Sequence, residues 1–126
     1  MTLADRAGTQ QITVLDTRDL AQTADFYERV LGLRLARDQG TCRIYHVSGE
    51  AYLGFCQRAD APAEPRGLTL TFVTDRVDEV CADLRRAGVG FVKEPADNPP
   101  YRIYNAFVRD PNGYLVEIQR FWEPLL

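Results

Sequence analysis

The sequence predicts an α+β fold built from two tandem βαβββ modules, and two observations lead to this prediction. First, shifting the chain along itself by 56 residues brings Asp19 onto Asp75 and Gly32 onto Gly88. Second, around these markers each half offers a strand, then a helical pattern, then three more strands. The 126 residues therefore indicate an internal structural repeat within one chain.

The helical pattern in each half has a predicted start and end. Asp19 and Asp75 each stand where a side-chain oxygen caps a helix, and Gly32 and Gly88 stand where a left-handed residue ends one. Apolar residues recur between these markers at helical spacing. The first stripe comprises Leu20, Ala24, Phe26, Tyr27, Val30 and Leu31, and the second comprises Val77, Val80, Cys81, Leu84 and Ala87.

The strands and the connection between the halves complete the predicted organisation. We expect one domain, 1–126, with a first module at 11–58, a linker at 59–66, a second module at 67–121 and a tail at 122–126. The predicted strands are 12–17, 32–38, 42–47, 51–56, 68–74, 89–94, 104–109 and 114–121.

Composition and charge exclude several classes of function. The net charge of −3 gives no basic footprint for nucleic acid or for an anionic membrane, and no apolar run is long enough to span a bilayer. The polar start of the chain lacks the apolar stretch of a signal peptide, so we expect a cytoplasmic protein. Cys42, Cys56 and Cys81 are odd in number and widely spaced, which favours buried free thiols.

The stretch "DPNGYLVEI" places a single carboxylate on an apolar strand. Asp110 and Pro111 suit the start of a type I turn, and Gly113 supplies the positive φ needed to enter the next strand. On that strand Glu117 shares a face with Leu115 and Gln119, because side chains alternate between faces. The opposite Val/Ile face is the natural one for a helix to cover, so Glu117 is expected on the concave face.

Three segments resemble the vicinal oxygen chelate superfamily, which includes glyoxalase I, bleomycin-resistance proteins and extradiol dioxygenases. They are "DLAQTADFYERVLGL", "DRVDEVCADLRRAGV" and "FVRDPNGYLVEIQRF", and the resemblance runs from about Gln11 to Phe121. It implies two modules that form a curved, mixed-sheet half-barrel around a cavity. It also implies a homodimer, which would cover the exposed edges of such a sheet. One such fold hosts many functions.

The resemblance also implies four metal-ligand positions, of which this chain keeps one. Metal-dependent members place a His on the first strand and a Glu on the last strand of each half. Those positions correspond here to Ile12, Leu68, Gly54 and Glu117, and only Glu117 can donate to a metal. A catalytic metal needs about three protein ligands, so we predict no metal cofactor at this site.

The predicted cavity face is largely apolar, which leaves Glu117 as its polar anchor. The residues expected on this face are Ile12, Val14, Leu68, Leu70 and Phe72, with Thr69 and Thr71 on the helix face. Whether these side chains line a pocket or fill it stays open. Glu117 itself is either a family carboxylate retained in the structure or a catalytic or ligand-binding group.

Further candidate ligand-binding residues lie in the stretch "NPPYRIYNAF". Arg102 can pair with an anionic ligand, and Tyr101 and Tyr104 can stack on a flat one. The alternative is a surface loop or a dimer contact. His46, the only histidine, is a weaker candidate on a strand. A displaced divalent-metal site, the remaining alternative, would draw on Asp16, His46, Cys56 and Glu117.

These features lead to three hypotheses about function. The first is a metal-independent protein that binds a small apolar or aromatic molecule, with Phe72, Tyr101, Arg102, Tyr104, His46 and Glu117 around it. The second is a glyoxalase-type lyase, isomerase or dioxygenase that uses Glu117 as a base or a displaced metal. The third is an interaction module with a filled core. The sequence identifies neither the ligand nor the pathway, and it leaves open whether the modules pack within one chain or swap between chains.

Overall fold

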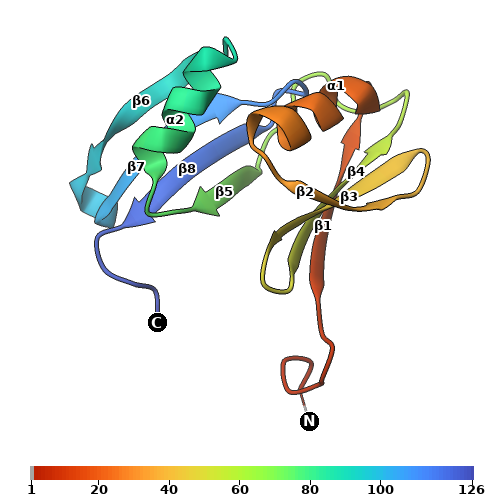
Figure 1. The fold of residues 1–126 in the computed structure, drawn as a ribbon, viewed down its shortest axis with the longest axis horizontal. Helices are drawn as coiled ribbons and strands as arrows, with labels where there is room; N and C mark the ends of the chain where they lie inside the picture. The colour runs from red at the N-terminus through yellow and green to blue at the C-terminus, as the bar shows by residue number, and fades with distance from the viewer. Residues whose placement is uncertain (1) are drawn as a thin grey trace. The chain divides into compact units, whose positions relative to one another are not determined.

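The computed structural model describes residues 2–126. These residues form two compact units, of which the first ends at Pro62 and the second begins at Ala63. Each unit contains one open, four-stranded mixed sheet and a helical segment (Figure 1). The predicted α+β fold of two βαβββ modules is confirmed.

The first unit has the sheet order β1-β4-β3-β2. Strands β1 and β4 pair in parallel, whereas β3 pairs antiparallel with both β4 and β2. Its elements are β1 (Gln11–Thr17), α1 (Leu20–Ala24), η1 (Asp25–Val30), β2 (Arg34–Asp38), β3 (Cys42–Ser48) and β4 (Ala51–Gln57).

The second unit repeats this topology with the sheet order β5-β8-β7-β6. Helix α2 packs on one face of the sheet, in contact with β6, β7 and β8. The elements of this unit are β5 (Thr69–Val73), α2 (Val77–Arg86), β6 (Phe91–Asn98), η2 (Pro99–Tyr101), β7 (Ile103–Arg109) and β8 (Leu115–Phe121). Among the described residues, no helix is both long and apolar enough to cross a membrane.

The two helical segments begin differently, and this corrects one prediction. Asp19 caps α1 as expected, since its Oδ1 accepts from the Gln22 backbone N–H at 3.1 Å. In the second unit the N-cap of α2 is Arg76, one residue beyond Asp75, and no side chain caps this helix. The prediction that Asp75 caps α2 is therefore wrong, and its carboxylate is not used at the helix terminus.

The first helical segment is one residue longer than the second. From N-cap to terminal glycine it runs from Asp19 to Gly32, whereas its counterpart runs from Arg76 to Gly88. The extra residue is absorbed by the π-helix η1, in which the Leu31 N–H donates to the Phe26 carbonyl, five residues back, at 3.0 Å. Such a π-type turn is how a helix accommodates an inserted residue.

The insertion explains why the expected faces of β5 are wrong. Before the helices the two modules correspond at a shift of 57 residues, so that Val14 matches Thr71 and not Leu70. Thr71 stands directly opposite Glu117 in the parallel pair and shares its face. Leu70 and Phe72 stand opposite Val116 and Ile118, on the face that α2 covers. The cavity-face prediction therefore fails for Leu70 and Phe72, although it holds for Val14.

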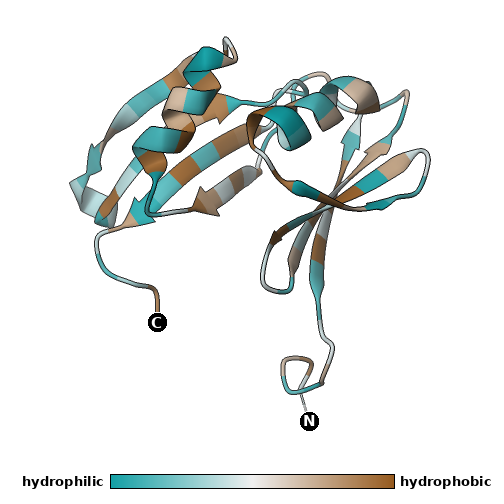
Figure 2. Cartoon of the chain, viewed as in Figure 1, coloured by the Kyte–Doolittle hydropathy of each residue, from teal (hydrophilic) through white to brown (hydrophobic). Residues whose placement is uncertain are grey.

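Each unit has its own apolar core between the sheet and the helical segment. In the first, Tyr27 of η1 packs against Tyr45 and Phe55, with ring centroids 6.3 and 4.6 Å away, and all three are fully buried. In the second, the core includes Val77 and Leu84 of α2 and Val116 and Ile118 of β8. Figure 2 shows the resulting alternation of apolar and polar positions along β8.

The cysteines do not all behave as the sequence suggests. Cys42 and Cys56 are directly opposite each other on β3 and β4, with Cα atoms 4.1 Å apart, and form a disulfide. The prediction of free thiols is wrong for these two, because strand register brings together residues that are distant in sequence. Cys81 is free and buried as predicted, and its burial raises the pKa of the thiol.

Candidate functional site

Glu117 lies near the middle of β8 on the sheet face opposite α2. Its side chain is buried, with 8% of its surface exposed, although it belongs to the sheet face that α2 does not cover. Thr71 of β5 is directly opposite on one side and Phe107 of β7 on the other. The sheet register therefore builds the surroundings of this carboxylate from three neighbouring strands.

Three neutral side chains donate hydrogen bonds to the Glu117 carboxylate. Thr71 Oγ1 donates to Oε1 at 2.8 Å, while Asn105 Nδ2 and Gln119 Nε2 donate to Oε2 at 2.8 and 2.9 Å. Asn105 and Gln119 are themselves buried. A buried carboxylate is costly unless hydrogen-bonded, and these contacts provide the required partners.

Lys93 fixes the orientation of the Asn105 side chain. Its Nζ donates to Asn105 Oδ1 at 2.6 Å and to the Asn105 carbonyl oxygen at 2.8 Å. An ammonium group can only donate, so the oxygen of the amide must face Lys93 and its NH₂ must face Glu117. One asparagine thus connects a cation on β6 to an anion on β8.

A pocket of about 420 Å³ opens on this face of the second unit. Its size falls within the usual range for small-molecule sites. Much of its wall is apolar or aromatic, and its polar atoms come from Asn98 and from the hydrogen-bonded group around Glu117. The lining residues are Asn98, Tyr101, Ile103, Asn105, Phe107, Glu117, Gln119 and Phe121.

Of the predicted site residues, Tyr101 and Glu117 line this pocket together. Tyr101 ends η2, is 73% exposed and forms part of the rim. Arg102 follows in a left-handed conformation with φ of 55° and turns away from the pocket. Its guanidinium pairs with Glu123 and lies 5.4 Å from the Trp122 ring centroid. The stretch predicted as a rim therefore supplies a tyrosine but no cation.

Tyr104 and Phe72 lie on the opposite face of the sheet from Glu117. The Tyr104 hydroxyl donates to Asp78 of α2 at 2.6 Å, and this hydrogen bond raises the pKa of Tyr104. Phe72 faces the same side through its pairing with Ile118. Neither residue lines the Glu117 pocket. Each is next in sequence to a residue that faces Glu117, and neighbouring strand residues point to opposite faces of the sheet.

His46 belongs to the first unit and is engaged locally. Its Nε2 lies 2.8 Å from the Gly49 carbonyl oxygen, and its ring centroid lies 5.2 Å from that of Tyr52. The same unit holds Asp16, which pairs with Arg58 at 3.2 Å. Cys56 is in the disulfide and offers no thiolate. The prediction that Cys56 is a ligand of a displaced metal site is therefore wrong.

The predicted metal-ligand positions carry no donor in the first unit. Gly54 and Val14 stand opposite each other on the uncovered sheet face, with Ile12 two residues along. In the second unit Leu68 lies just outside β5, and the strand residues that share the face of Glu117 are Thr69, Thr71 and Val73. Threonine is not among the usual zinc ligands. Across residues 2–126 no group of three His, Cys, Asp or Glu is placed to hold a metal ion.

Sequence reasoning missed four residues of the Glu117 group or assigned them no role. The alternation of apolar and polar residues along β8 predicts that Gln119 shares the face of Glu117, but it assigns Gln119 no role. Asn105 interrupts an otherwise apolar strand, "IYNAFV", and an isolated buried amide of this kind indicates a polar partner. Thr71 and Lys93 gave no comparable signal, because their contacts depend on strand pairing and on a β-bulge in β6.

Comparison with protein families gives one match over most of the chain. The model of the Glyoxalase/Bleomycin resistance protein/Dioxygenase superfamily matches residues 10–118. This range includes the first βαβββ module and most of the second, and it ends within β8, one residue after Glu117.

Similar proteins and solved structures agree with this match. Virulence protein STM3117 of Salmonella typhimurium is 29% identical, covering 86% of this chain and 81% of its own length. A lactoylglutathione lyase of Neisseria meningitidis is 28% identical, with coverages of 83% and 85%. The crystal structure of STM3117 has a TM-score of 0.70 at 26% identity, covering 93% of this chain and 97% of that one. A glyoxalase/dioxygenase from Nostoc punctiforme has the same fold, with a TM-score of 0.78 at 16% identity and 92% of each chain covered.

Proposed function

Because the chain belongs to the Glyoxalase/Bleomycin resistance protein/Dioxygenase superfamily, we propose that it binds a small apolar or aromatic molecule beside Glu117, without the metal of its metal-dependent relatives. The observation that carries this proposal is a buried carboxylate, hydrogen-bonded on both oxygens, in the wall of an apolar pocket. Such pockets, with a few placed polar groups, are the usual form of small-molecule sites.

The hydrogen bonds around Glu117 define the polar group that the ligand should carry. Glu117 accepts three hydrogen bonds, one of them from the Gln119 amide NH₂. The Oε1 atom of Gln119 therefore remains as a second acceptor for a ligand. The nearby cations do not supply donors to the ligand, since Lys93 is bound to Asn105 and Arg102 to Glu123. The ligand is therefore one with a hydrogen-bond donor, such as a hydroxyl, an amide N–H or an amine. This replaces the anionic group that Arg102 was expected to bind.

The apolar part of the ligand has four side chains to contact. Ile103 and Phe107 project from β7, Phe121 from the end of β8, and Tyr101 stands at the rim. Burial of an aromatic ring against such side chains stabilises a complex at about 25 cal/mol per Å² of apolar surface. We therefore expect a monocyclic or bicyclic aromatic compound with one donor group.

A ligand screen by thermal shift tests the proposal, with matched variants to locate each hit. Glu117→Gln alters the carboxylate, and Tyr101→Ala removes an exposed rim contact without disturbing the core. Glu79→Gln makes the same chemical change at an exposed ion pair of α2 and serves as the control. Hits should raise the melting temperature of wild type and of the control. Loss of at least tenfold in affinity, about 1.4 kcal/mol, is expected in the other two variants. A screen whose hits all bind the four proteins equally would refute the proposal.

A second candidate is an enzyme of the glyoxalase type with Glu117 as its base. It is favoured by the similarity to a lactoylglutathione lyase and by the Oε1 atom, which accepts a single hydrogen bond, from Thr71. A carboxylate with remaining acceptor capacity in an apolar pocket suits proton abstraction beside a carbonyl group. Any turnover should be lost in Glu117→Gln and kept in Glu79→Gln. If it depended instead on a displaced divalent metal, a chelator would abolish it and added metal would restore it.

We also infer a homodimer. Both sheets are open, and β1, β2, β5 and β6 are their outer strands. The unpaired backbone groups of an outer strand favour covering by another chain. Light scattering coupled to size-exclusion chromatography should give twice the chain mass of 14.3 kDa. A single species of the chain mass would contradict this inference.

A further inference from the structure

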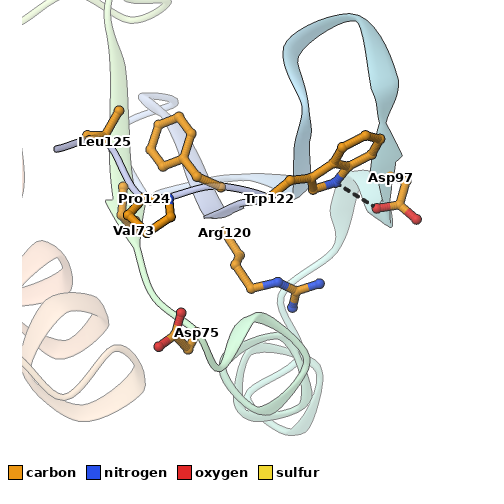
Figure 3. A pocket seen from close by; sticks show the side chains of 8 residues that line it. Val73, Asp75, Asp97, Arg120, Trp122, Pro124 and Leu125 are labelled. Carbon is orange, nitrogen blue, oxygen red and sulfur yellow. Dashed lines mark hydrogen bonds between the residues drawn. The ribbon is translucent and has the colours of Figure 1, made fainter.

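A second pocket, of about 820 Å³, lies at the end of β8 in the same unit. Figure 3 shows that its side chains come from the ends of β5, β6 and β8 and from the C-terminal segment. It shares Phe121 with the Glu117 pocket but none of the other residues of that site. The lining residues are Val73, Asp75, Asp97, Arg120, Phe121, Trp122, Pro124 and Leu125.

Trp122 is held in place as one wall of this pocket. Its backbone N–H donates to the Arg102 carbonyl oxygen at 2.9 Å, and its indole Nε1 donates to Asp97 Oδ1 at 3.1 Å. The Arg102 guanidinium carbon lies 5.4 Å from the ring centroid. The indole nevertheless remains 43% exposed. An aromatic surface that is fixed before binding loses little conformational entropy when a ligand packs against it.

Arg120 is a half-buried cation with unused donors. Its guanidinium lies 4.8 Å from the centroid of the Tyr104 ring, which orients it. It makes no ion pair or hydrogen bond with a described residue, whereas the neighbouring Arg102 is paired with Glu123. A guanidinium fixed by an aromatic ring is suited to bind a carboxylate through two parallel hydrogen bonds.

Asp75 supplies an opposite charge to the same pocket. It is exposed, it does not cap α2, and none of the described side chains forms an ion pair with it. In Figure 3 the Arg120 side chain extends between Asp75 and Asp97. Since Asp97 already accepts from Trp122, the two charged groups left for a ligand are the Arg120 guanidinium and the Asp75 carboxylate.

We propose that this pocket binds a small zwitterion with an aromatic side group, that is, an aromatic α-amino acid. Its carboxylate pairs with Arg120, its ammonium group with Asp75, and its ring packs against Trp122. Val73, Pro124 and Leu125 complete the apolar wall. A site that pairs with both charges of the ligand discriminates against analogues that lack either of them.

The chain contains a single tryptophan, so Trp122 fluorescence reports directly on this pocket. The probes are L-phenylalanine, 3-phenylpropionate, which lacks the ammonium group, and phenethylamine, which lacks the carboxylate. L-phenylalanine should give a saturable change in emission, and each analogue should bind at least tenfold more weakly. An equal affinity for L-phenylalanine and 3-phenylpropionate would overturn the zwitterion assignment, and no saturable change with any probe would overturn the site.

Variants separate this pocket from the Glu117 pocket. Arg120→Met should reduce the affinity for L-phenylalanine at least tenfold, Arg120→Lys should reduce it less, and Asp75→Asn should remove the preference over 3-phenylpropionate. Arg66→Met, at an exposed arginine of the same unit, is the matched control and should bind like wild type. Glu117→Gln should also bind like wild type. Loss of binding in Glu117→Gln with retention in Arg120→Met would place the amino acid in the other pocket and refute this proposal.

Discussion

The Asn105 side chain donates a hydrogen bond of 2.8 Å to Glu117, and this contact fixes the carboxylate at the centre of the sheet face. Because the same amide accepts a hydrogen bond from Lys93, the Lys93 ammonium group and the Glu117 carboxylate both rely on Asn105 as a hydrogen-bond partner. The energetic consequences of that dependence can be measured.

Asn105→Leu should destabilise the protein by about 3 kcal/mol, since it removes a partner from both Lys93 and Glu117. Chemical denaturation at neutral pH measures the change in the free energy of unfolding. Asn98→Leu is the control: Asn98 lines the same pocket, and its side chain makes no hydrogen bond with a described residue. Equal effects of the two substitutions would show that the connection to Lys93 and Glu117 contributes nothing.

The protein should contain no stoichiometric metal. Glu117 has neutral donors on both oxygens, and the described part of the chain offers no second and third ligand beside it. Elemental analysis of untagged protein measures the content, and titration with zinc, nickel, manganese and iron(II) measures binding. Stoichiometric metal in wild type that is lost in Glu117→Gln would reverse the prediction and move the metal-dependent enzyme to first place.

Stability should fall as pH rises from about 10 to about 12. Burial and the hydrogen bond to Glu28 raise the pKa of Tyr45 from 10.0 to about 12. In that interval the unfolded chain releases the phenolic proton while the folded chain retains it, so rising pH favours unfolding. The loss attributable to Tyr45 should be about 2–3 kcal/mol. Denaturation curves at several pH values measure it, and Tyr45→Phe should show a correspondingly shallower dependence. An identical dependence in the variant would exclude Tyr45 as the cause.

Reduction of the Cys42–Cys56 disulfide should lower the free energy of unfolding by about 2–4 kcal/mol, the usual range for such a loop. Thiol titration of denatured protein should find one free thiol before reduction and three after it. The double variant Cys42→Ser/Cys56→Ser should be insensitive to reductant, whereas Cys81→Ser should respond like wild type. Three reactive thiols in protein purified without reductant would contradict the pairing.

Much of the fold could be predicted because its signals are local. The glycines at 32, 88 and 113 all adopt positive φ as the turn and helix-end patterns required, and Asp110 organises its turn by accepting from the Asn112 and Tyr114 backbone N–H groups. The faces of β5 could not be predicted from the repeat. A one-residue π-type insertion changes the correspondence between the modules within the helix, and a one-residue error on a strand reverses every side chain.

In the candidate site, too, the residue with a local sequence signal could be predicted, whereas its partners from other strands could not. Glu117 could be identified because β8 alternates clearly after a recognisable turn. Its partners Thr71 and Asn105 could not, because they reach it only through the register of β5 and β7. The chemistry of Arg102 and Tyr104 favours a binding site, but the left-handed turn at Arg102 and the strand phase of β7 direct both side chains away from the Glu117 pocket.

Gly54 shows that a side chain can be introduced on the first module's sheet face. A Cβ atom at this position would lie 3.5 Å from Val14 Cγ2 and 3.7 Å from Ile44 Cγ1, which are ordinary contact distances. Crowding therefore does not require glycine at position 54. This sheet face lacks donor side chains because of the residues that stand there, not because space is short. The first module has room to be re-engineered at Gly54, and donor side chains introduced there and at Val14 offer a starting point for a designed metal centre in a scaffold whose natural polar group lies in the other module.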